Sequence, residues 1–455
     1  MVERVKTVFL SLLVITSLIF TWQLWTYQPE LGLLDEESVE ESEQLSDQVE
    51  MADVVGPANV TFHRDDEQWT TTHGSLDFVD DMATDLFSSE WSNFEMLEGV
   101  GQERVYESEE DKIELIFPTS LPLTLVESWF EDDQSIVEQE ENTFNFERLL
   151  IIDEGGALRV QLVSFDDEQV LEGYIDMDVE TFHTYMEQMD GSSVSYATEA
   201  HVGEDDGSLQ KPVYLPSEPV SYPQLQFNST SIDEEALLPY LFPDRESVVT
   251  PDSGSDAQGD QLYHSSDRQM RLSRFGNYIE YDYPQNEISD GQNEQIISDA
   301  YTFINAHGGF TNSYQLYDWS VSGGGDSVQF RMHVDGMPVL DTNTSWFDYA
   351  SINVTQQNDV ISSYDRPAFM FDEHEPLDEN PEGQMRELLG GEEVLAEIEE
   401  SDSLELDNIE DIRIGYEMER VETYVYVVPH WYAKSDDSWI RLDSEDQEGD
   451  LSGLE

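Results

Sequence analysis

The sequence contains no cysteine among its 455 residues. This absence excludes disulfide bonds, thiolate metal sites, a cysteine nucleophile and a lipid-modified N-terminal cysteine. It is compatible both with the cytosol and with the outside of a cell that does not rely on disulfide bonds. The compartment therefore has to be inferred from another part of the chain.

Basic residues are also scarce. The chain has 19 lysines and arginines against 101 acidic residues, which gives a formal net charge of −82, and its only lysines are Lys6, Lys112, Lys211 and Lys434. Such a surface repels nucleic acids, whose binding depends on cationic contacts to phosphate, and it repels anionic lipid headgroups. Because the acids are spread over the whole chain, we interpret them as an adaptation of the entire surface to salty or alkaline surroundings, as in a halophilic or alkaliphilic bacterium.

Motifs for catalysis and metal binding are missing as well. The nine histidines form no H-E-x-x-H motif and no close pair suited to zinc. The acidic run around His374, residues 372–375, is the most ligand-like group, but such runs are expected by chance in a chain this acidic. Asp252, Asp256 and Asp260 depart from the EF-hand spacing, which favours a solvated turn and leaves weak surface calcium binding open. We therefore predict a protein without a metal, a cofactor or an enzymatic activity.

One long apolar segment, residues 8–25, stands out against this polar background. It carries no charge, it follows two basic residues, and it ends in aromatic residues that suit a membrane interface. We predict a transmembrane helix over residues 8–27, with residues 1–7 in the cytoplasm and the bulk of this single-pass cell-membrane protein outside the cell. A cleaved signal peptide is the rival interpretation, but it requires small residues after the apolar run, and bulky ones stand there.

One face of this predicted helix has a pattern of its own. At about 100° per residue, small hydroxyl residues and their neighbours fall on one side. These residues are Ser11, Val14, Ser17, Leu18, Thr21 and Trp25. Small residues let helices approach closely in lipid, so the face is our candidate partner-binding site. The alternative is that the hydroxyl groups only satisfy their own backbone.

The rest of the chain predicts an α+β protein with antiparallel sheets, organised as three domains outside the membrane. An acidic linker is expected over residues 28–55, followed by an N-terminal α+β domain and a connector rich in serine, glycine and proline. A middle α+β domain and a C-terminal α+β domain complete the plan. The four parts after the linker are residues 56–190, 191–222, 223–290 and 291–445.

Local patterns predict several particular elements. The spacing of apolar residues over 77–97 indicates one helix that includes Trp91. A glycine pair indicates a hairpin turn at residues 155–156. A further helix over 380–400 is interrupted at residues 390–391, and a short helix near residue 234 has Ser231 as a plausible cap.

Two aromatic clusters alternate along predicted strands. They consist of Tyr314, Tyr317 and Trp319, and of Tyr424, Tyr426, His430, Trp431 and Tyr432. Residues of this kind favour a sheet core. An exposed protein-contact face is the alternative, because tyrosine and tryptophan are favoured anchors in interfaces.

The segments TWQLWTYQP (21–29) and IELIFPTSLPLTLVESWF (113–130) are the most distinctive stretches of the chain. With the layout of the strand-rich last third, they resemble the YycH family of extracytoplasmic regulatory proteins of Gram-positive bacteria. The resemblance implies three extracytoplasmic α+β domains, the last of them YycI-like. It also implies a regulator of a sensor histidine kinase of the WalK (YycG) type that controls cell-wall metabolism through WalR. The implied partners are that kinase and a YycI-like protein, contacted through the transmembrane helix.

Two other functions remain open from the residues. The first is an extracytoplasmic binding or inhibitory module for a wall ligand or a protease. The second is a membrane-anchored wall hydrolase, which requires a cleft with a converging acid, base or metal. Carboxylate pairs are too frequent in this chain to single out the two that a glycosidase uses.

Overall fold

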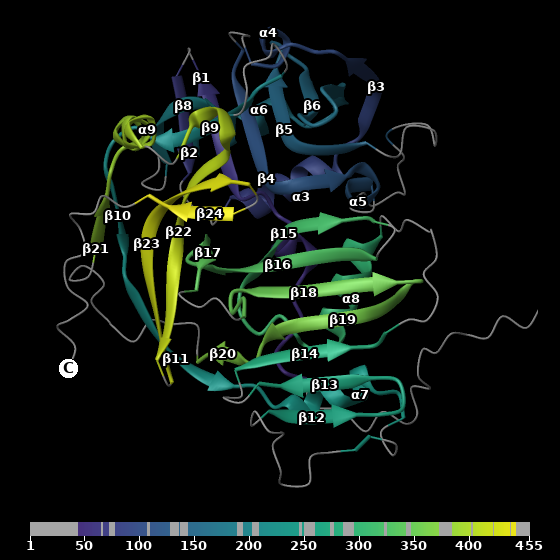
Figure 1. Ribbon diagram of the computed structural model, residues 1–455. Helices are drawn as coiled ribbons and strands as arrows, with labels where there is room; N and C mark the ends of the chain where they lie inside the picture. The colour runs from purple at the N-terminus through teal and green to yellow at the C-terminus, as the bar shows by residue number, and fades with distance from the viewer. Residues whose placement is uncertain are drawn as a thin grey trace, which may run out of the picture. The chain divides into compact units, whose positions relative to one another are not determined.

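The computed structural model describes most of the chain between residues 44 and 442 (Figure 1). The gaps within that range are residues 65–66, 72–77, 107–109, 128–135, 137–143, 189–193, 203–208, 245–247, 250–259, 274–276, 285–294, 323–324, 343–346, 373–384, 402–403, 422 and 437. The predicted transmembrane helix, residues 8–27, lies outside the described part. Within the described part, no helix is both long enough and apolar enough to cross a bilayer.

The first sheet contains nine strands and is antiparallel throughout. Its strands in spatial order are β3 (Trp91–Glu98), β7 (Gln169–Ile175), β6 (Leu158–Ser164), β5 (Asn145–Asp153), β4 (Lys112–Pro122), β1 (Asn59–Arg64), β2 (Glu67–Thr71), β8 (Val194–Val202) and β9 (Lys211–Pro216). The inner strand β6 is buried along its whole length, so both faces of the sheet are covered there.

The second sheet contains thirteen strands, and one of its pairings, β17 with β22, is parallel. The main path runs through β12 (Gln261–His264), β13 (Gln269–Leu272), β14 (Tyr278–Asp282), β19 (Val360–Pro367), β18 (Ser351–Gln357), β16 (Asp326–Val334), β17 (Met337–Asp341), β22 (Ile409–Val421), β23 (Tyr424–Ser435), β11 (Leu225–Ser231) and β20 (Phe369–Phe371). Two further strands pair beside this path, β15 (Tyr314–Ser320) with β16 and β24 (Ser438–Arg441) with β23. The strands β10 (Val220–Pro223) and β21 (Met385–Leu388) form a separate pair.

Short helices cover these sheets. They are α2 (Met51–Val54), α3 (Val79–Ser88), α4 (Gln102–Val105), α5 (Leu123–Glu127), α6 (Val179–Gln188), α7 (Leu238–Leu241), α8 (Ile296–Ala306) and α9 (Gly391–Glu400), with 3-10 turns at Glu234–Leu237 and Leu406–Asn408. The apolar side of α8 (Ile296, Ile297, Ala300 and Ile304) is fully buried against the second sheet, and Figure 1 shows the helix behind β18 and β19. The expectation of an α+β protein with largely antiparallel sheets is therefore confirmed.

The glycine pair at residues 155–156 forms the predicted hairpin turn between β5 and β6, with φ angles of 77° and 139°. The predicted helix over 77–97 is wrong in its second half, because α3 ends at Ser88 and Trp91 begins β3. The side chain of Trp91 nevertheless lies against the end of α3, because its indole N–H donates to the carbonyl oxygen of Leu86 at 2.9 Å. This contact explains why Trp91 fits the helical spacing. Tertiary pairing of β3 with β7 overrides the local pattern there.

Two other local predictions also need correction. The segment before the glycine pair at 390–391 is strand β21 rather than helix, and the helix α9 begins at Gly391. Ser231 does not cap the turn that follows it, since it is the last residue of β11 and pairs with Phe369. The cap is Asp233, whose carboxylate accepts a hydrogen bond from the amide of Glu235 at 3.0 Å.

The predicted domain boundaries stay a prediction, but the strands cross them. Residues 191–222, expected as a connector, contain β8 and β9, which complete the first sheet, and most of β10. Strand β11, placed by the sequence in a middle domain, pairs with β23 near the end of the chain. Long-range pairing of this kind leaves no local signal in composition or periodicity.

Residues 44–55, which we call the N-terminal strap, lie against the second half of the chain before β1 begins. The amide of Leu45 donates to the carbonyl oxygen of His307 at 3.0 Å, and the amide of Val49 donates to the side-chain oxygen of Asn305 at 2.9 Å. Val54 and Val55 are buried in the core. The last twelve residues of the segment expected as a solvated linker are therefore fixed to α8 and its C-terminal turn.

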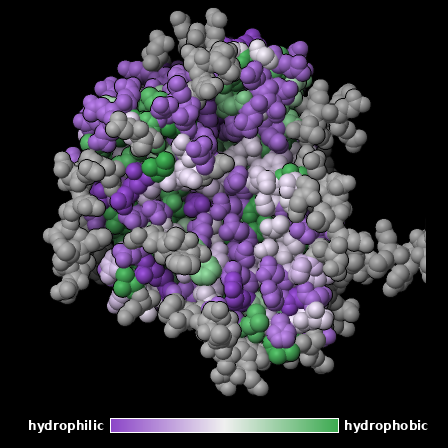
Figure 2. All heavy atoms as spheres, viewed as in Figure 1, coloured by the Kyte–Doolittle hydropathy of each residue, from purple (hydrophilic) through white to green (hydrophobic). Residues whose placement is uncertain are grey.

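The molecular surface is largely hydrophilic on the face that Figure 2 shows, and its hydrophobic residues lie singly or in small groups. Such scattered apolar residues are normal for a protein surface and do not mark a docking site. A functional site therefore has to be sought in a hollow of the structure.

Candidate functional site

The predicted partner-binding face of the transmembrane helix lies outside the described residues. Its members, Ser11, Val14, Ser17, Leu18, Thr21 and Trp25, therefore remain a prediction. Of the weak metal candidates, Asp260 and Asp372 are described, while Asp252, Asp256 and His374 are not. Among described residues, no three histidine or acidic side chains are placed to hold a metal ion.

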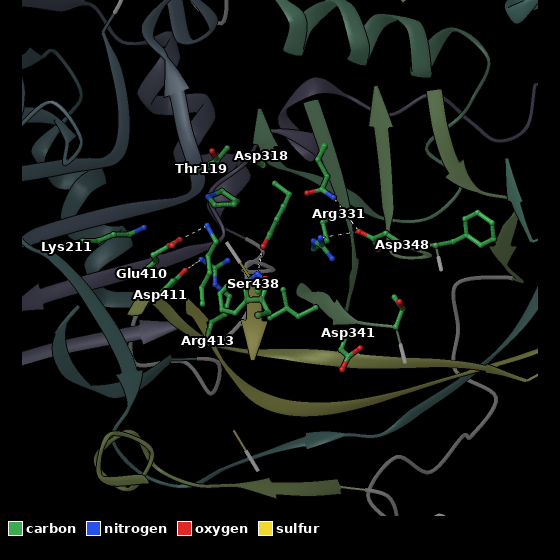
Figure 3. A pocket seen from close by; sticks show the side chains of 18 residues that line it. Thr119, Lys211, Asp318, Arg331, Asp341, Asp348, Glu410, Asp411, Arg413 and Ser438 are labelled. Atoms are coloured by element: carbon green, nitrogen blue, oxygen red, sulfur yellow. Dashed lines mark hydrogen bonds and ion pairs between the residues drawn. The ribbon is translucent and has the colours of Figure 1, made fainter. Parts of the chain in front are cut away.

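A polar cavity of about 800 Å³ lies between strands of the two sheets (Figure 3). Its first-sheet wall consists of Pro118 and Thr119 on β4 and Lys211 at the start of β9. The opposite walls come from β15, β16, β17, β22, β23 and β24 of the second sheet. A volume of this size falls in the range of small-molecule binding sites, so the cavity is our candidate functional site.

Irregular strand pairing builds this cavity. Single extra residues interrupt three pairings of the second sheet, Tyr317 on β15, Leu340 on β17 and Glu410 on β22, and all three line the cavity. In the first sheet, the pairing of β4 with β5 is broken between Ile116 and Leu121, around the cavity-lining Pro118 and Thr119. Bulges bend strands and redirect side chains, which accounts for a hollow where regular sheets would pack closely.

Charged pairs line the cavity. Lys434 lies 2.8 Å from Glu410, Arg413 forms an ion pair with Asp411, and Arg331 lies 3.3 Å from Asp348. Asp318 and Asp341 add two further carboxylates. The lining therefore holds five acidic and four basic residues, the fourth base being Lys211.

Aromatic rings stack against two of these cations. The guanidinium of Arg331 lies 4.2 Å from the ring centre of Tyr317, and that of Arg413 lies 5.1 Å from the ring centre of Trp439. The indole N–H of Trp439 donates to the Tyr317 hydroxyl, which joins the two rings. Stacking of this kind fixes the planar guanidinium groups in orientation.

Lys211 differs from the other three cations of the cavity. Among the residues that the structure describes, none lies within ion-pair or hydrogen-bond distance of its ammonium group. Burial lowers the pKa of Lys211, as do the neighbouring charges of Arg148 and Arg413, while those of Asp411 and Glu147 act in the opposite direction. The ammonium group is therefore a cation without a fixed counter-ion.

Asp411, in contrast to Lys211, is stabilised in its charged form. Burial alone would raise the pKa of its carboxyl, but the charges of Arg413 and Lys211 and the hydrogen bond from Arg413 hold that pKa below its usual value. The carboxylate also accepts a hydrogen bond from the amide of Ile412 at 2.8 Å. Asp411 is thus ionised, and its carboxylate already has partners in Arg413 and the amide of Ile412.

A buried carboxylate, Glu114, lies on β4, the strand that also carries the lining residues Pro118 and Thr119. It is fully inaccessible and accepts hydrogen bonds from the Tyr214 hydroxyl at 2.9 Å and the Tyr106 hydroxyl at 3.1 Å. Nε2 of His63 and Nε of Arg148 lie 2.9 Å and 3.2 Å from its two oxygens. Burial opposes ionisation, yet the hydrogen bonds of His63 and Tyr214 and the charge of Arg148 lower the pKa of Glu114. Both oxygens already have partners, so this group is structural rather than reactive. We call Glu114 and its four partners, Tyr106, Tyr214, His63 and Arg148, the node.

The node connects to the cavity through Arg148. A guanidinium N–H of Arg148 donates to the carbonyl oxygen of Pro212 at 3.4 Å, next to Lys211 in the chain. The node thus fixes the strand end from which Lys211 projects. No pattern in the sequence predicted this cavity, although the composition held one signal: two of only four lysines, Lys211 and Lys434, lie on its wall.

Comparison with known proteins gives the family. The N-terminal domain of the YycH protein matches residues 3–192, and the C-terminal domain of the YycH protein matches residues 210–449. The chain belongs to the YycH family. This confirms the resemblance carried by the two distinctive segments of the sequence.

Two relatives in the YycH family illustrate the relationship. The two-component system WalR/WalK regulatory protein YycH of Bacillus subtilis (strain 168) is 23% identical over 488 residues, which cover 100% of this chain and 99% of that protein. The crystal structure of YycH from Bacillus subtilis superposes with a TM-score of 0.68 at 17% identity, covering 89% of this chain and 100% of that one. The fold is therefore that of YycH, over nearly the full length of both chains.

Proposed function

We propose that this chain is a non-enzymatic regulator of a two-component system, acting on a sensor histidine kinase of the WalK type that controls cell-wall metabolism. The observation that carries the proposal is the end-to-end match to a YycH protein named as a regulator of the WalR/WalK system. Regulation without catalysis requires only that the chain binds one kinase conformation more tightly than another. The difference between those two affinities sets the size of the effect.

In this proposal, residues 8–27 anchor the chain in the cell membrane, with the N-terminus in the cytoplasm and the described domains outside. The helix face with Ser11, Ser17 and Thr21 contacts the kinase helices, and a YycI-like protein completes the complex. The N-terminal strap supports this arrangement, because the first described residues after the predicted anchor are bound to α8 rather than left free. A change in the outer domains would then reach the strap, which begins 17 positions after the end of the predicted anchor.

Co-purification from membranes tests the contact. We expect the kinase to co-purify with the full chain and to be lost when Ser11, Ser17 and Thr21 are all replaced by leucine, since bulky side chains prevent close approach of helices. The variant Thr16→Leu, on another side of the same helix, is the matched control and should retain the kinase. Equal recovery of the kinase with the triple variant would reject the helix contact. Mature protein that begins beyond Pro29 would reject the anchor itself.

A further inference from the structure

The cavity between the two sheets has an unusual charge for this chain. Four of the 19 basic residues lie among its 18 lining residues, against a chain average of one basic residue in about 24. Acidic residues are only slightly more frequent there than elsewhere, five among 18 against 101 among 455. The cavity lining, with a formal charge of −1, is thus less repulsive to a small anion than an average part of a protein of net charge −82.

The charges are unevenly placed within the cavity. Three cations, Lys211, Arg413 and Lys434, gather at one end with Glu410 and Asp411, and the two ion pairs there leave Lys211 over. Asp341 and Asp348 lie at the other end, as Figure 3 shows. Glu410 and Asp411 are each held by another cation, so neither neutralises the ammonium group of Lys211 by direct contact.

We propose that this end of the cavity binds a small oxyanion, a carboxylate or a phosphate group, with Lys211 as its charged anchor. Figure 3 shows the side chain of Lys211 extending from β9 toward the residues of β22. A ligand placed there would contact Lys211 from the first sheet and Arg413 from the second, and it would therefore join the two halves of the molecule. The site concerns the chain alone and does not depend on the proposed kinase partner.

A purely structural role for these charges is the competing explanation. Ion pairs alone account for Arg331, Arg413 and Lys434, each of which has a carboxylate partner. They do not account for Lys211, which is half-buried, and withdrawing its ammonium group from water without a partner costs free energy unless an anion compensates it. Nor do they account for a volume of about 800 Å³, since ion pairs that merely join two sheets need no hollow.

Lysine labelling of the wild-type full chain in detergent micelles tests the proposal directly. The four lysines can be followed separately by mass spectrometry after brief reaction with an amine-reactive ester. Lys6 serves as the reference, and Lys112 is a second internal standard because it is 1% exposed and donates to the carbonyl oxygen of Tyr106 at 2.8 Å. The buffer contains chloride as its only small anion, and inorganic phosphate or acetate is then added at constant ionic strength.

We expect phosphate or acetate to slow the labelling of Lys211 in a saturable way, by about tenfold at saturation if the bound anion stabilises the ammonium form by about 1.4 kcal/mol. Labelling of Lys6 should stay unchanged. Protection by phosphate alone identifies a phosphate group as the ligand chemistry, and protection by acetate alone identifies a carboxylate. Labelling of Lys211 that neither anion slows beyond the effect of equal chloride overturns the proposal.

Calorimetric titration of variants gives an independent test. Lys211→Met should weaken binding of the protective anion about tenfold, because a charge-assisted hydrogen bond is lost, whereas Lys211→Arg should keep it. Arg271→Met is the matched control, since it removes one positive charge from an exposed pair with Glu280 on the outer strands β13 and β14. Equal binding by Lys211→Met and wild type overturns the assignment of Lys211, and the labelling result stands even if this variant fails to fold.

Discussion

A Cβ atom added to Gly308 would lie 2.0 Å from the backbone oxygen of Ser46. The two residues are separated by 262 positions, and the hydroxyl of Ser46 donates to the carbonyl oxygen of Gly308 at 2.7 Å. Gly308 also has a φ angle of 64°, in the left-handed region that favours glycine. It is therefore required twice, once to end α8 and once to let the N-terminal strap approach.

The variant Gly308→Ala should release the strap. The clash with Ser46 comes in addition to the left-handed strain, which by itself costs about 1 kcal/mol. Hydrogen exchange is the measurement: the amides of Leu45 and Val49, which donate to His307 and Asn305, should exchange at least about tenfold faster.

The variant Gly99→Ala is the matched control for the strap. Gly99 has nearly the same φ angle, 61°, but no atom lies within 4 Å of an added Cβ. It should lose only the strain energy and leave exchange at Leu45 and Val49 unchanged. Equal exchange rates in the two alanine variants would show that the strap does not depend on the close approach at Gly308.

Replacement of Glu114 by glutamine should destabilise the first half of the chain. The amide would place a donor against the donors of Tyr106, Tyr214, His63 or Arg148, and it would leave Arg148 without its buried counter-charge. Breaking a buried pair in this way costs about 3–5 kcal/mol. Urea unfolding of the two proteins measures the difference.

The exposed Glu95→Gln on β3 of the same sheet is the control for Glu114. It makes the same chemical change at the surface and should alter stability by less than about 0.5 kcal/mol. A loss for Glu114→Gln as small as that of the control would mean that the node contributes little to stability.

Asp365 should make stability fall as the pH rises. Burial raises its pKa to about 7, and the neighbouring carboxylates of Glu280 and Asp282 act in the same direction. The unfolded chain loses this proton near its ordinary pKa of about 4, whereas the folded protein keeps it until about pH 7. Between these values the folded state binds more protons than the unfolded state, so its stability decreases with pH and levels off above about pH 7.

The variant Asp365→Asn should remove this dependence. Relative to wild type, its free energy of unfolding should rise by about 1–3 kcal/mol from pH 5 to pH 8, since one unit of pKa difference corresponds to 1.36 kcal/mol. Urea unfolding at the two pH values measures the gain. Asp267→Asn, which changes an exposed aspartate in the turn between β12 and β13, should show no such difference between the two pH values. A pH-independent difference between Asp365→Asn and wild type would contradict the raised pKa.

Salt should stabilise the protein. A formal net charge of −82 makes the compact state repel itself, and screening weakens that repulsion. We expect the Tm to rise when sodium chloride is increased from 10 to 300 mM, with most of the change at the low end, where the Debye length shortens fastest. Sucrose in place of salt controls for solvent effects other than screening. A flat Tm over this range would remove the interpretation of the acidic surface as an adaptation to salt.

The sequence predicted those parts of the fold that depend on neighbouring residues. The hairpin at Gly155 followed from turn chemistry. Four of the eight residues in the two aromatic clusters are buried, Tyr314, His430, Trp431 and Tyr432, whereas Tyr424 is exposed. The second half of the helix expected to include Trp91 failed because the side chain packs with the helix while its backbone pairs with β7. The periodicity of apolar residues reflects which side chains pack together, but it carries no information on which strands pair through their backbones.

The cavity could not be predicted from sequence, because its walls come from strands that are far apart in the chain. Lys211 and Arg331 are 120 positions apart, and only the pairing of the sheets and their bulges brings them around one hollow. The predicted face with Ser11 and Ser17 is a different case. It rests on one short local segment, so its pattern could be seen in the sequence, and it stays a prediction.

The pairing of β11 with β23 has a consequence for how the molecule is made. Leu225 lies beside Val427, so about 200 residues must be synthesised before this early strand finds its neighbour. Until the ribosome has finished the β22–β23 hairpin, β11 has one edge open, and an open edge invites pairing with other chains. The nascent chain therefore has to be kept apart from other copies of itself. Loss of even its last few dozen residues would leave the second sheet without its longest hairpin.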